Sequence, residues 1–232
     1  MDCKKSYLKI FNELVNAPFD VTKYTYKREQ DLFDSYPYNE HIQFLHPKKL
    51  KGFIRPISYD SPTFIRISRI EHSPVTIFYS IISTSFGDLV MGHTDLGICY
   101  LAFFNPDSIT TLQKEFPEAS LKKCSTSLHT KVCDFLNGKH NHTFDLHVKA
   151  TPFQLRVWKA LSHLPEGQLT TYKYIAESIQ HSKASIAVGA AIGKNPIALL
   201  IPCHRVIRQN GVWYGFRWGN ITKASLLRYE LQ

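Results

Sequence analysis

The chain has 232 residues, of which 44% are hydrophobic, and carries 28 Lys and Arg against 19 Asp and Glu, a net charge of +9. No stretch approaches the roughly 18 uncharged apolar residues of a membrane span, and the first residues lack the apolar segment of a signal peptide. These features exclude a membrane-spanning or secreted protein. We therefore expect a globular protein with no membrane partner, in the cytoplasm or, in a eukaryote, in the nucleus.

The first 74 residues are rich in Tyr and Phe but contain no recognisable motif. Residues 8–14 have the apolar spacing of a short helix. The lysine-rich run at residues 48–51 is interpreted as solvated surface rather than as a nucleic-acid patch. We treat residues 1–74 as an N-terminal extension of unknown role.

Residues 75–147 show a regular succession of β-forming runs and turns. Strands are expected at 75–83, 89–93 and 98–104, with turns at 86–88 and 94–97, so that two hairpins make a small antiparallel meander. Two further segments have the apolar spacing of helices, and the second is stopped by Asn137-Gly138. These helices are expected at residues 108–116 and 128–136.

Residues 148–232 form a third, helical block. Its first helix begins with Thr151 as N-cap, Pro152 at the first helical position and Gln154 as the capping-box partner. Thr171 is placed to cap a second helix, and a third helix follows at residues 183–192, with nearly all of its residues small. Two short helices joined by a brief turn are a helix-turn-helix candidate.

This third block is also the basic part of the chain. Residues 151–232 hold ten Lys and Arg against three acidic residues, a balance of +7, while the first 150 residues carry the other +2. A compact basic segment suits binding to a phosphate backbone, because each neutralised phosphate releases counterions. A solvated basic surface would give the same count, so charge alone leaves both interpretations open.

The five cysteines are odd in number and scattered, and no C-x-x-C pair occurs among Cys3, Cys99, Cys124, Cys133 and Cys203. Reduced thiols and no structural metal are therefore expected. His140 and His142 lie near Cys133 in the sequence, but their surroundings are typical of a polar turn. We expect no metal site there.

The segment Pro202-Cys203-His204-Arg205-Val206 lies inside an otherwise apolar stretch, residues 197–207. A thiol beside an imidazole, between a β-like run and a polar turn, is the minimum equipment for an activated sulfur nucleophile. An inert structural cysteine would look the same, because Cys is among the most buried residue types. The motifs around the pentapeptide decide between these interpretations.

Several motifs follow one another in a fixed order between residues 150 and 230. They are Thr151-Pro152-Phe153-Gln154 with Val157-Trp158, Thr171-Tyr172 with Ile175-Ala176, Ala187-Val188-Gly189-Ala190-Ala191, Asn195-Pro196, the Cys203 segment, Gly215-Phe216-Arg217-Trp218-Gly219 and Lys223-Ala224-Ser225-Leu226-Leu227. Together they closely resemble the O6-alkylguanine-DNA alkyltransferases, also called methylated-DNA–protein-cysteine methyltransferases. Residues 75–147 resemble that family's N-terminal domain more loosely.

The resemblance implies an α+β fold in two domains. Residues 75–147 would form a small ribonuclease-H-like, antiparallel-sheet domain. Residues 148–232 would form a helical, winged-helix-like domain with a helix-turn-helix, which binds DNA and holds the active site. The resemblance gives residues 1–74 no role.

The same resemblance implies a DNA-repair enzyme that moves the alkyl group of O6-alkylguanine, and also of O4-alkylthymine, irreversibly onto Cys203. The thiolate would displace the base from an sp³ carbon in one step, with no metal and no cofactor. His204 would act as the base through a water, Glu230 would orient His204, and Asn195 would hold the cysteine loop. Each molecule would act once, because the thioether cannot be hydrolysed by this equipment and no second cysteine is placed to resolve it.

On the DNA side, the resemblance implies a monomer that binds double-stranded DNA through the minor groove and extrudes the damaged nucleotide. Tyr172 would contact a phosphate and rotate that nucleotide. The other residues implied at the DNA are Thr171, Ala184, Ser185, Ile186, Ala187, Gly189, Lys194 and Arg205. The residues implied around the flipped base are Pro202, Val206, Tyr214, Gly215, Phe216 and Arg217.

Two positions depart from the family's pattern. Ile186 stands where the family carries an arginine that fills the space left by the extruded nucleotide, although isoleucine is still an apolar wedge. Phe216 stands where the family carries a tyrosine that stabilises the departing guanine, with Tyr214 nearby as a substitute. Losing such a donor typically costs about two to three orders of magnitude in rate. We expect a slow reaction, or one shifted toward single-stranded or unpaired DNA.

Two other functions are weighed against this one. A protein that binds alkylated DNA and passes it to repair or regulatory machinery is favoured by Ile186 and Phe216, but the presence of Cys203 counts against it. A hydrolytic Cys-His enzyme would need an oxyanion hole, and the sequence does not identify one.

Overall fold

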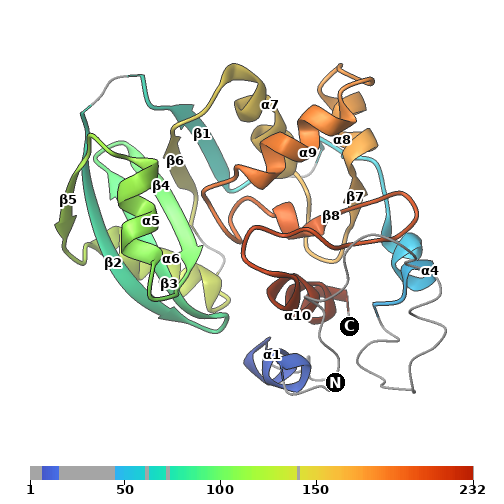
Figure 1. The fold of residues 1–232 in the computed structure, drawn as a ribbon, viewed down its shortest axis with the longest axis horizontal. Helices are drawn as coiled ribbons and strands as arrows, with labels where there is room; N and C mark the ends of the chain where they lie inside the picture. Colours follow the sequence, from blue (N-terminus) through green and yellow to red (C-terminus); the bar gives the residue numbers. More distant parts are fainter. Residues whose placement is uncertain (1–6, 16–44, 61–62, 72–73, 140–141, 232) are drawn as a thin grey trace.

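The computed structural model describes residues 7–15, 45–60, 63–71, 74–139 and 142–231, and it confirms the α+β class (Figure 1). The first elements along the chain are α1 (Tyr7–Val15), α4 (Pro47–Leu50), η1 (Lys51–Phe53), β1 (Ile65–Arg69), β2 (Thr76–Thr84), β3 (Gly87–Thr94) and β4 (Gly97–Phe103). The middle of the chain forms α5 (Ser108–Glu115), β5 (Ser120–Lys123), α6 (Ser127–Leu136) and β6 (Phe144–Val148). The last elements are α7 (Pro152–Leu161), β7 (Thr170–Thr171), α8 (Tyr172–Ser178), α9 (Ser185–Gly193), η2 (Cys203–Arg205), β8 (Val206–Ile207) and α10 (Asn220–Leu231).

A six-stranded sheet in the order β1-β6-β4-β3-β2-β5 forms the first unit. The predicted meander is confirmed, since β2–β3 and β3–β4 pair antiparallel. The sheet is mixed rather than wholly antiparallel, because β1, β5 and β6 join it through parallel pairings. β1 belongs to the segment 1–74, so part of that segment is a strand of this sheet. The boundary at residue 75 stays a prediction.

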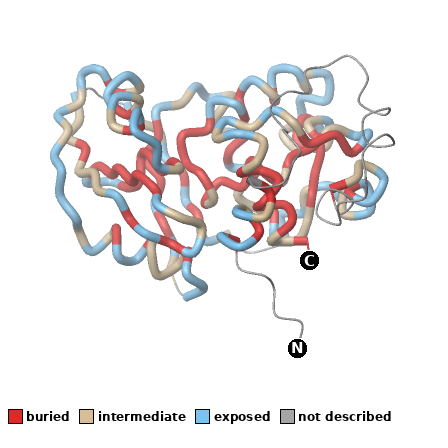
Figure 2. Tube along the Cα trace, turned by 60° about the horizontal axis from the view of Figure 1, so that its bottom comes forward, coloured by how far each residue is buried: buried red, intermediate tan, exposed pale blue. Residues whose placement is uncertain are grey.

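Both faces of the central strands are buried, and the pleat sends alternate residues to two different cores. Val90, Tyr100 and Ala102 pack with α5 on one face. Leu89 and Met91 face the other way, into a larger cluster shared with α6, α7, α9 and the segment around Cys203. Buried residues accordingly lie both in the sheet and in the C-terminal unit (Figure 2). This shared core fixes the cysteine segment against the sheet.

Local capping sets the helices of the C-terminal unit as expected. Thr151 and Gln154 form the predicted capping box at the start of α7, and Thr171 caps α8 by accepting a hydrogen bond from the backbone N–H of Tyr174. Such a cap stabilises a helix by about 1 kcal/mol. α9 begins at Ser185 rather than at residue 183, because Ala184 is bound by its backbone N–H to the turn at His181.

The N-terminal extension packs against the C-terminal unit. The helix predicted at residues 8–14 is confirmed as α1, and its Ile10 and Leu14 join a cluster with Leu227 and Leu231 of α10. Residues 45–60 lie along the same unit, with Leu50 fully buried. The aromatic residues noted in the extension between 16 and 44 lie outside the described residues. Among the helices that the structure describes, none is long and apolar enough to cross a membrane.

Candidate active site

Cys203 begins the short helix η2 and is only 3% exposed. Its segment is docked on the sheet, because the backbone N–H of Leu101 in β4 donates to Pro196 and the N–H of Ala198 donates back to Leu101. Leu199 has a left-handed φ of +64°, which is costly for a residue with a side chain. The sulfur therefore lies where a constrained loop leads into the short helix η2.

Asn195 ties this loop together from inside the core, where it is fully buried. Its Nδ2 donates to the carbonyls of Ile197 and Ile201 and lies 3.2 Å from Sγ of Cys203, while its Oδ1 accepts from the N–H of Ile197 at 2.9 Å. Asn195, expected to hold the cysteine loop, thus hydrogen-bonds to Ile197 and Ile201 of that loop. Its amide also touches the sulfur directly.

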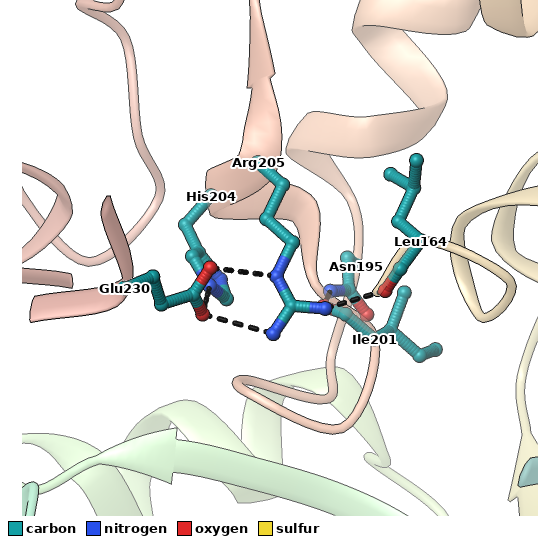
Figure 3. A network of polar contacts seen from close by, with 6 residues as sticks. All are labelled: Leu164, Asn195, Ile201, His204, Arg205 and Glu230. Carbon is teal, nitrogen blue, oxygen red and sulfur yellow. Dashed lines mark hydrogen bonds and ion pairs between the residues drawn. The ribbon is translucent and has the colours of Figure 1, made fainter. Parts of the chain in front are cut away.

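His204 and Glu230 meet although 26 residues separate them in the chain. Nε2 of His204 lies 2.7 Å from Oε1 of Glu230, on α10, and both side chains are buried (Figure 3). A carboxylate only accepts hydrogen bonds, so Nε2 carries the proton. Nδ1 is buried and has no hydrogen-bond partner among the described residues. The neutral imidazole thus keeps its Nδ1 lone pair available as a base.

Arg205 occupies the other side of the same carboxylate. Its Nε and one of its amino groups lie 2.8 and 2.9 Å from the two oxygens of Glu230, and it also donates to the carbonyl of Leu164 (Figure 3). Burial alone would raise the pKa of Glu230, but the charges and hydrogen bonds of Arg205 and His204 bring that pKa well below its ordinary value. Arg205, expected at the DNA, is thus placed where it keeps Glu230 ionised.

Burial works against the charged forms of both Cys203 and His204. Desolvation raises the pKa of the Cys203 thiol, although the hydrogen bond from Asn195 and the charge of Lys223 oppose this. Desolvation also lowers the pKa of His204 against the opposing influence of Glu230. At rest the site therefore holds a thiol and a neutral imidazole, which is the protonation state a base needs before it accepts a proton.

Lys223 is a charged residue of this site that the sequence did not assign. It is 1% exposed on α10, where its Nζ donates to the carbonyl of Val206 at 2.7 Å and lies 6.0 Å from the ring centre of Phe216. Desolvation lowers its pKa to about 8, opposed by the charge of Cys203. The sequence signal that could have identified Lys223 is its place among apolar positions of a helix.

The residues expected at the DNA lie mostly on the outer side of α8 and α9. Ile186 is 91% exposed near the start of α9. Gly189 faces the ring of Tyr172, and a Cβ on it would lie 3.6 Å from that ring, so α9 and the start of α8 pack closely. Thr171 is buried as the cap of α8. The remaining expected residues on this side are half-buried or exposed: Ala184, Ser185, Ala187 and Lys194.

The residues expected around the flipped base separate into two groups. Phe216 packs on the core cluster that contains Cys203, while Tyr214 packs on Trp213 in the cluster around α10. Arg217 pairs with Glu115 and donates to the backbone carbonyl of Asn195. Phe216, rather than Tyr214, therefore faces the cysteine side. Of the other expected residues, Pro202 and Val206 are buried and Gly215 is exposed.

The histidines considered above as metal ligands belong to a different part of the chain, after α6. His140, considered above as a ligand, lies outside the described residues. Across the part of the chain that the structure covers, no group of three or more His, Cys, Asp or Glu side chains is arranged to hold a metal ion.

Comparisons with known proteins identify the family of the chain. Residues 152–232 match the family model described as "6-O-methylguanine DNA methyltransferase, DNA binding domain". The chain is 33% identical over 168 residues to the inducible methylated-DNA–protein-cysteine methyltransferase of Bacillus subtilis, covering 69% of this chain and 94% of that protein. The crystal structure of Mycobacterium tuberculosis OGT in complex with DNA aligns with a TM-score of 0.55 and 31% identity, over 66% of this chain and 92% of that one.

A longer relative is the Escherichia coli protein named "Bifunctional transcriptional activator/DNA repair enzyme Ada", 32% identical over 164 residues. The match covers 68% of this chain, and this chain spans 46% of the length of that protein. The B. subtilis protein, by contrast, is matched over nearly all of its length, and about a third of the present chain lies outside that match. The chain belongs to the family of methylated-DNA–protein-cysteine methyltransferases.

Proposed function

We propose that this protein is a DNA-repair enzyme that transfers the alkyl group of O6-alkylguanine, and also of O4-alkylthymine, in DNA to Sγ of Cys203. The observation that carries the proposal is the buried sulfur, held by Asn195 beside a neutral His204 whose other nitrogen is fixed on Glu230. Relatives named as methylated-DNA–protein-cysteine methyltransferases support the same chemistry.

The proposed step is a single displacement at carbon. The S–C bond forms as the C–O bond to the base breaks, and the electron pair of that bond stays on the departing base. The thiol proton passes through a water to Nδ1 of His204, and the imidazolium then returns this proton through water to the departing base, so that no net proton is gained or lost. Glu230, kept ionised by Arg205, stabilises the imidazolium that forms. Among the described residues Cys203 has no disulfide partner, since Cys99, Cys124 and Cys133 are also free, so each molecule acts once.

DNA enters this proposal through α8 and α9. Ile186, which is 91% exposed, is the proposed apolar wedge that occupies the space left by the extruded nucleotide in the minor groove. Tyr172 stands next to Gly189 and is proposed to contact a phosphate. We propose that a monomer binds duplex DNA in this way, in the cytoplasm or in a eukaryotic nucleus, with single-stranded DNA as the alternative substrate.

Turnover counting tests the proposal. The protein is incubated with a molar excess of duplex carrying O6-[³H-methyl]guanine, and the label bound to protein is counted against time. We expect the label to level off at one methyl group per molecule. Cys203→Ala is expected to bind the same duplex and take up no label, while Cys133→Ala, half-buried on α6, is expected to behave as the wild type.

A protein that only recognises alkylated DNA would give a different result. It would bind the lesion duplex tightly and acquire no label, with or without Cys203. Continued release of methanol would instead indicate hydrolysis. Either result would overturn the proposed single transfer.

A further inference from the structure

Residues 45–60, called the strap below, are fixed along one side of the helix-turn-helix (Figure 1). The backbone N–H of Arg55 donates to Leu169 at 2.8 Å, and the N–H of Leu169 donates to Phe53 at 3.0 Å. Next in the chain, the hydroxyl of Thr170 donates to the carbonyl of Arg55 at 3.0 Å. These contacts add the strap to β7, the strand that leads directly into α8.

Two other contacts fix the strap at its start. The indole N–H of Trp213 donates to the carbonyl of Leu45 at 3.2 Å. Gly211 has a φ of +90°, and a Cβ on it would lie 2.2 Å from the carbonyl oxygen of Pro47, so only glycine allows this close approach. The turn between Arg208 and Gly211 therefore lies directly against α4. The strap is held in place relative to both α8 and this turn.

The strap is strongly basic. It has four cations, Lys48, Lys49, Lys51 and Arg55, and one acidic residue, Asp60, at its end. All four cations are exposed. In the part of the chain that the structure describes, none of them forms an ion pair with a carboxylate. A rigid segment thus presents unpaired positive charge beside the elements proposed to bind DNA.

We propose that the strap is a second contact surface for duplex DNA, in which Lys48, Lys49 and Lys51 bind phosphates that flank the site occupied by α8 and α9. The inference rests on the proposed function, because it needs DNA to be present at the helix-turn-helix. It gives part of the extension a role and revises the interpretation of residues 48–51 as solvated surface. Phosphates of DNA are the fitting partner, because each phosphate that an unpaired lysine neutralises releases a condensed counterion from the DNA.

The salt dependence of DNA binding tests this surface. Binding of an unmodified duplex by the full chain is measured by fluorescence anisotropy over about 50–200 mM salt. Each phosphate contact contributes about 0.9 to the slope of log K against log salt. The triple variant Lys48→Gln/Lys49→Gln/Lys51→Gln should therefore reduce the size of that slope by roughly 2.7. The matched control Lys114→Gln/Lys123→Gln/Lys131→Gln removes the same charge from exposed positions on α5, β5 and α6, and should keep the wild-type slope.

Transfer from the free base O6-benzylguanine separates this inference from the proposed function, because that substrate needs no DNA contact. We expect the strap variant to be alkylated at the wild-type rate by the free base and more slowly by a lesion duplex at low concentration. A strap variant with the wild-type slope, or a control variant with an equal loss, would overturn the strap surface and leave the alkyl transfer intact. A wild-type protein that binds no duplex would overturn both.

Discussion

Nε2 of His204 lies 2.7 Å from Oε1 of Glu230, and the two side chains are 1% and 7% exposed. This hydrogen bond fixes the tautomer of His204, so that Nδ1 and not Nε2 is the basic atom. It also places the negative charge that an imidazolium would need directly against the ring. In the proposed reaction, His204 is therefore oriented by a residue 27 positions beyond Cys203 in the chain.

Glu230→Gln is expected to slow alkyl transfer roughly 10²-fold, the lower end of the contribution of a positioned acid-base pair. The amide cannot stabilise an imidazolium, and it leaves Arg205 without its anion. The rate is measured as label transferred in a single turnover with saturating lesion duplex. The control Glu118→Gln, on an exposed turn before β5, should react at the wild-type rate. An unchanged rate in Glu230→Gln would remove Glu230 from the relay.

Lys223→Gln is expected to make Cys203 less reactive near neutral pH. Burial raises the pKa of the Cys203 thiol and the charge of Lys223 opposes this, so loss of that charge should lower the rate of Cys203 alkylation wherever Lys223 is protonated. The difference should be largest below pH 8, where Lys223 is protonated, and should vanish well above it. The rate of Cys203 alkylation by iodoacetamide, followed by peptide mass, gives the profile without DNA. Superimposable profiles would contradict this role.

The same lysine makes stability depend on pH. Its pKa is about 8 in the folded protein against an ordinary 10.5, so between these values the unfolded chain binds more protons. The free energy of unfolding contributed by Lys223 therefore rises with pH from 8 to 10.5 and is lowest below pH 8. Urea unfolding across this range should show the rise in the wild type and a smaller one in Lys223→Gln. Equal slopes in the two proteins would show that Lys223 is not the group responsible.

Ile186→Ala is expected to leave stability unchanged and to impair repair of duplex DNA. A side chain that is 91% exposed contributes within about 0.5 kcal/mol to folding. If it is buried between bases, it gains part of the roughly 1.5–3 kcal/mol of a buried aliphatic side chain, which predicts about a tenfold slower transfer from a duplex. Single-stranded substrate should be affected less. Ile81→Ala, at an exposed position of β2, serves as the control.

Ile10→Ala changes a residue of the N-terminal extension, but we expect it to destabilise the C-terminal unit. Ile10 is fully buried against α10, the helix that carries Lys223 and Glu230. Removing such a side chain costs about 2–5 kcal/mol, whereas Leu8→Ala on the exposed side of α1 should cost less than about 1 kcal/mol. Urea unfolding followed by tryptophan fluorescence measures both. Equal stability of the two variants would mean that α1 is not part of the folded unit in solution.

Features set by neighbouring residues could be predicted from the sequence. The cap at Thr151, the cap at Thr171 and the hairpins of β2–β4 all depend on residues a few positions apart. The strands β1 and β6 were missed because their parallel partners lie far away in the chain, with Ile65 opposite Phe144. No local pattern signals such a pairing.

The residues of the site likewise separate into those that the sequence predicted and those that it did not. The motif order indicated Cys203, His204 and Asn195, and the structure places the amide of Asn195 3.2 Å from Sγ of Cys203. The positions of Arg205 and Lys223 could not be read from the sequence, because a basic residue on a DNA-binding unit is expected to face DNA. Arg205 is instead half-buried against the carboxylate of Glu230, and Lys223 is buried at the carbonyl of Val206, both of which come from distant segments.

Peptide mass spectrometry after one reaction with DNA tests the central claim most directly. The protein is incubated with a slight excess of duplex containing O6-methylguanine, digested, and all cysteine-containing peptides are compared. We predict one added methyl group on Cys203 at a yield approaching one per molecule, with Cys99, Cys124 and Cys133 unmodified. An unmodified Cys203 in protein that has bound the duplex, or a methyl group on another cysteine, would contradict the assignment.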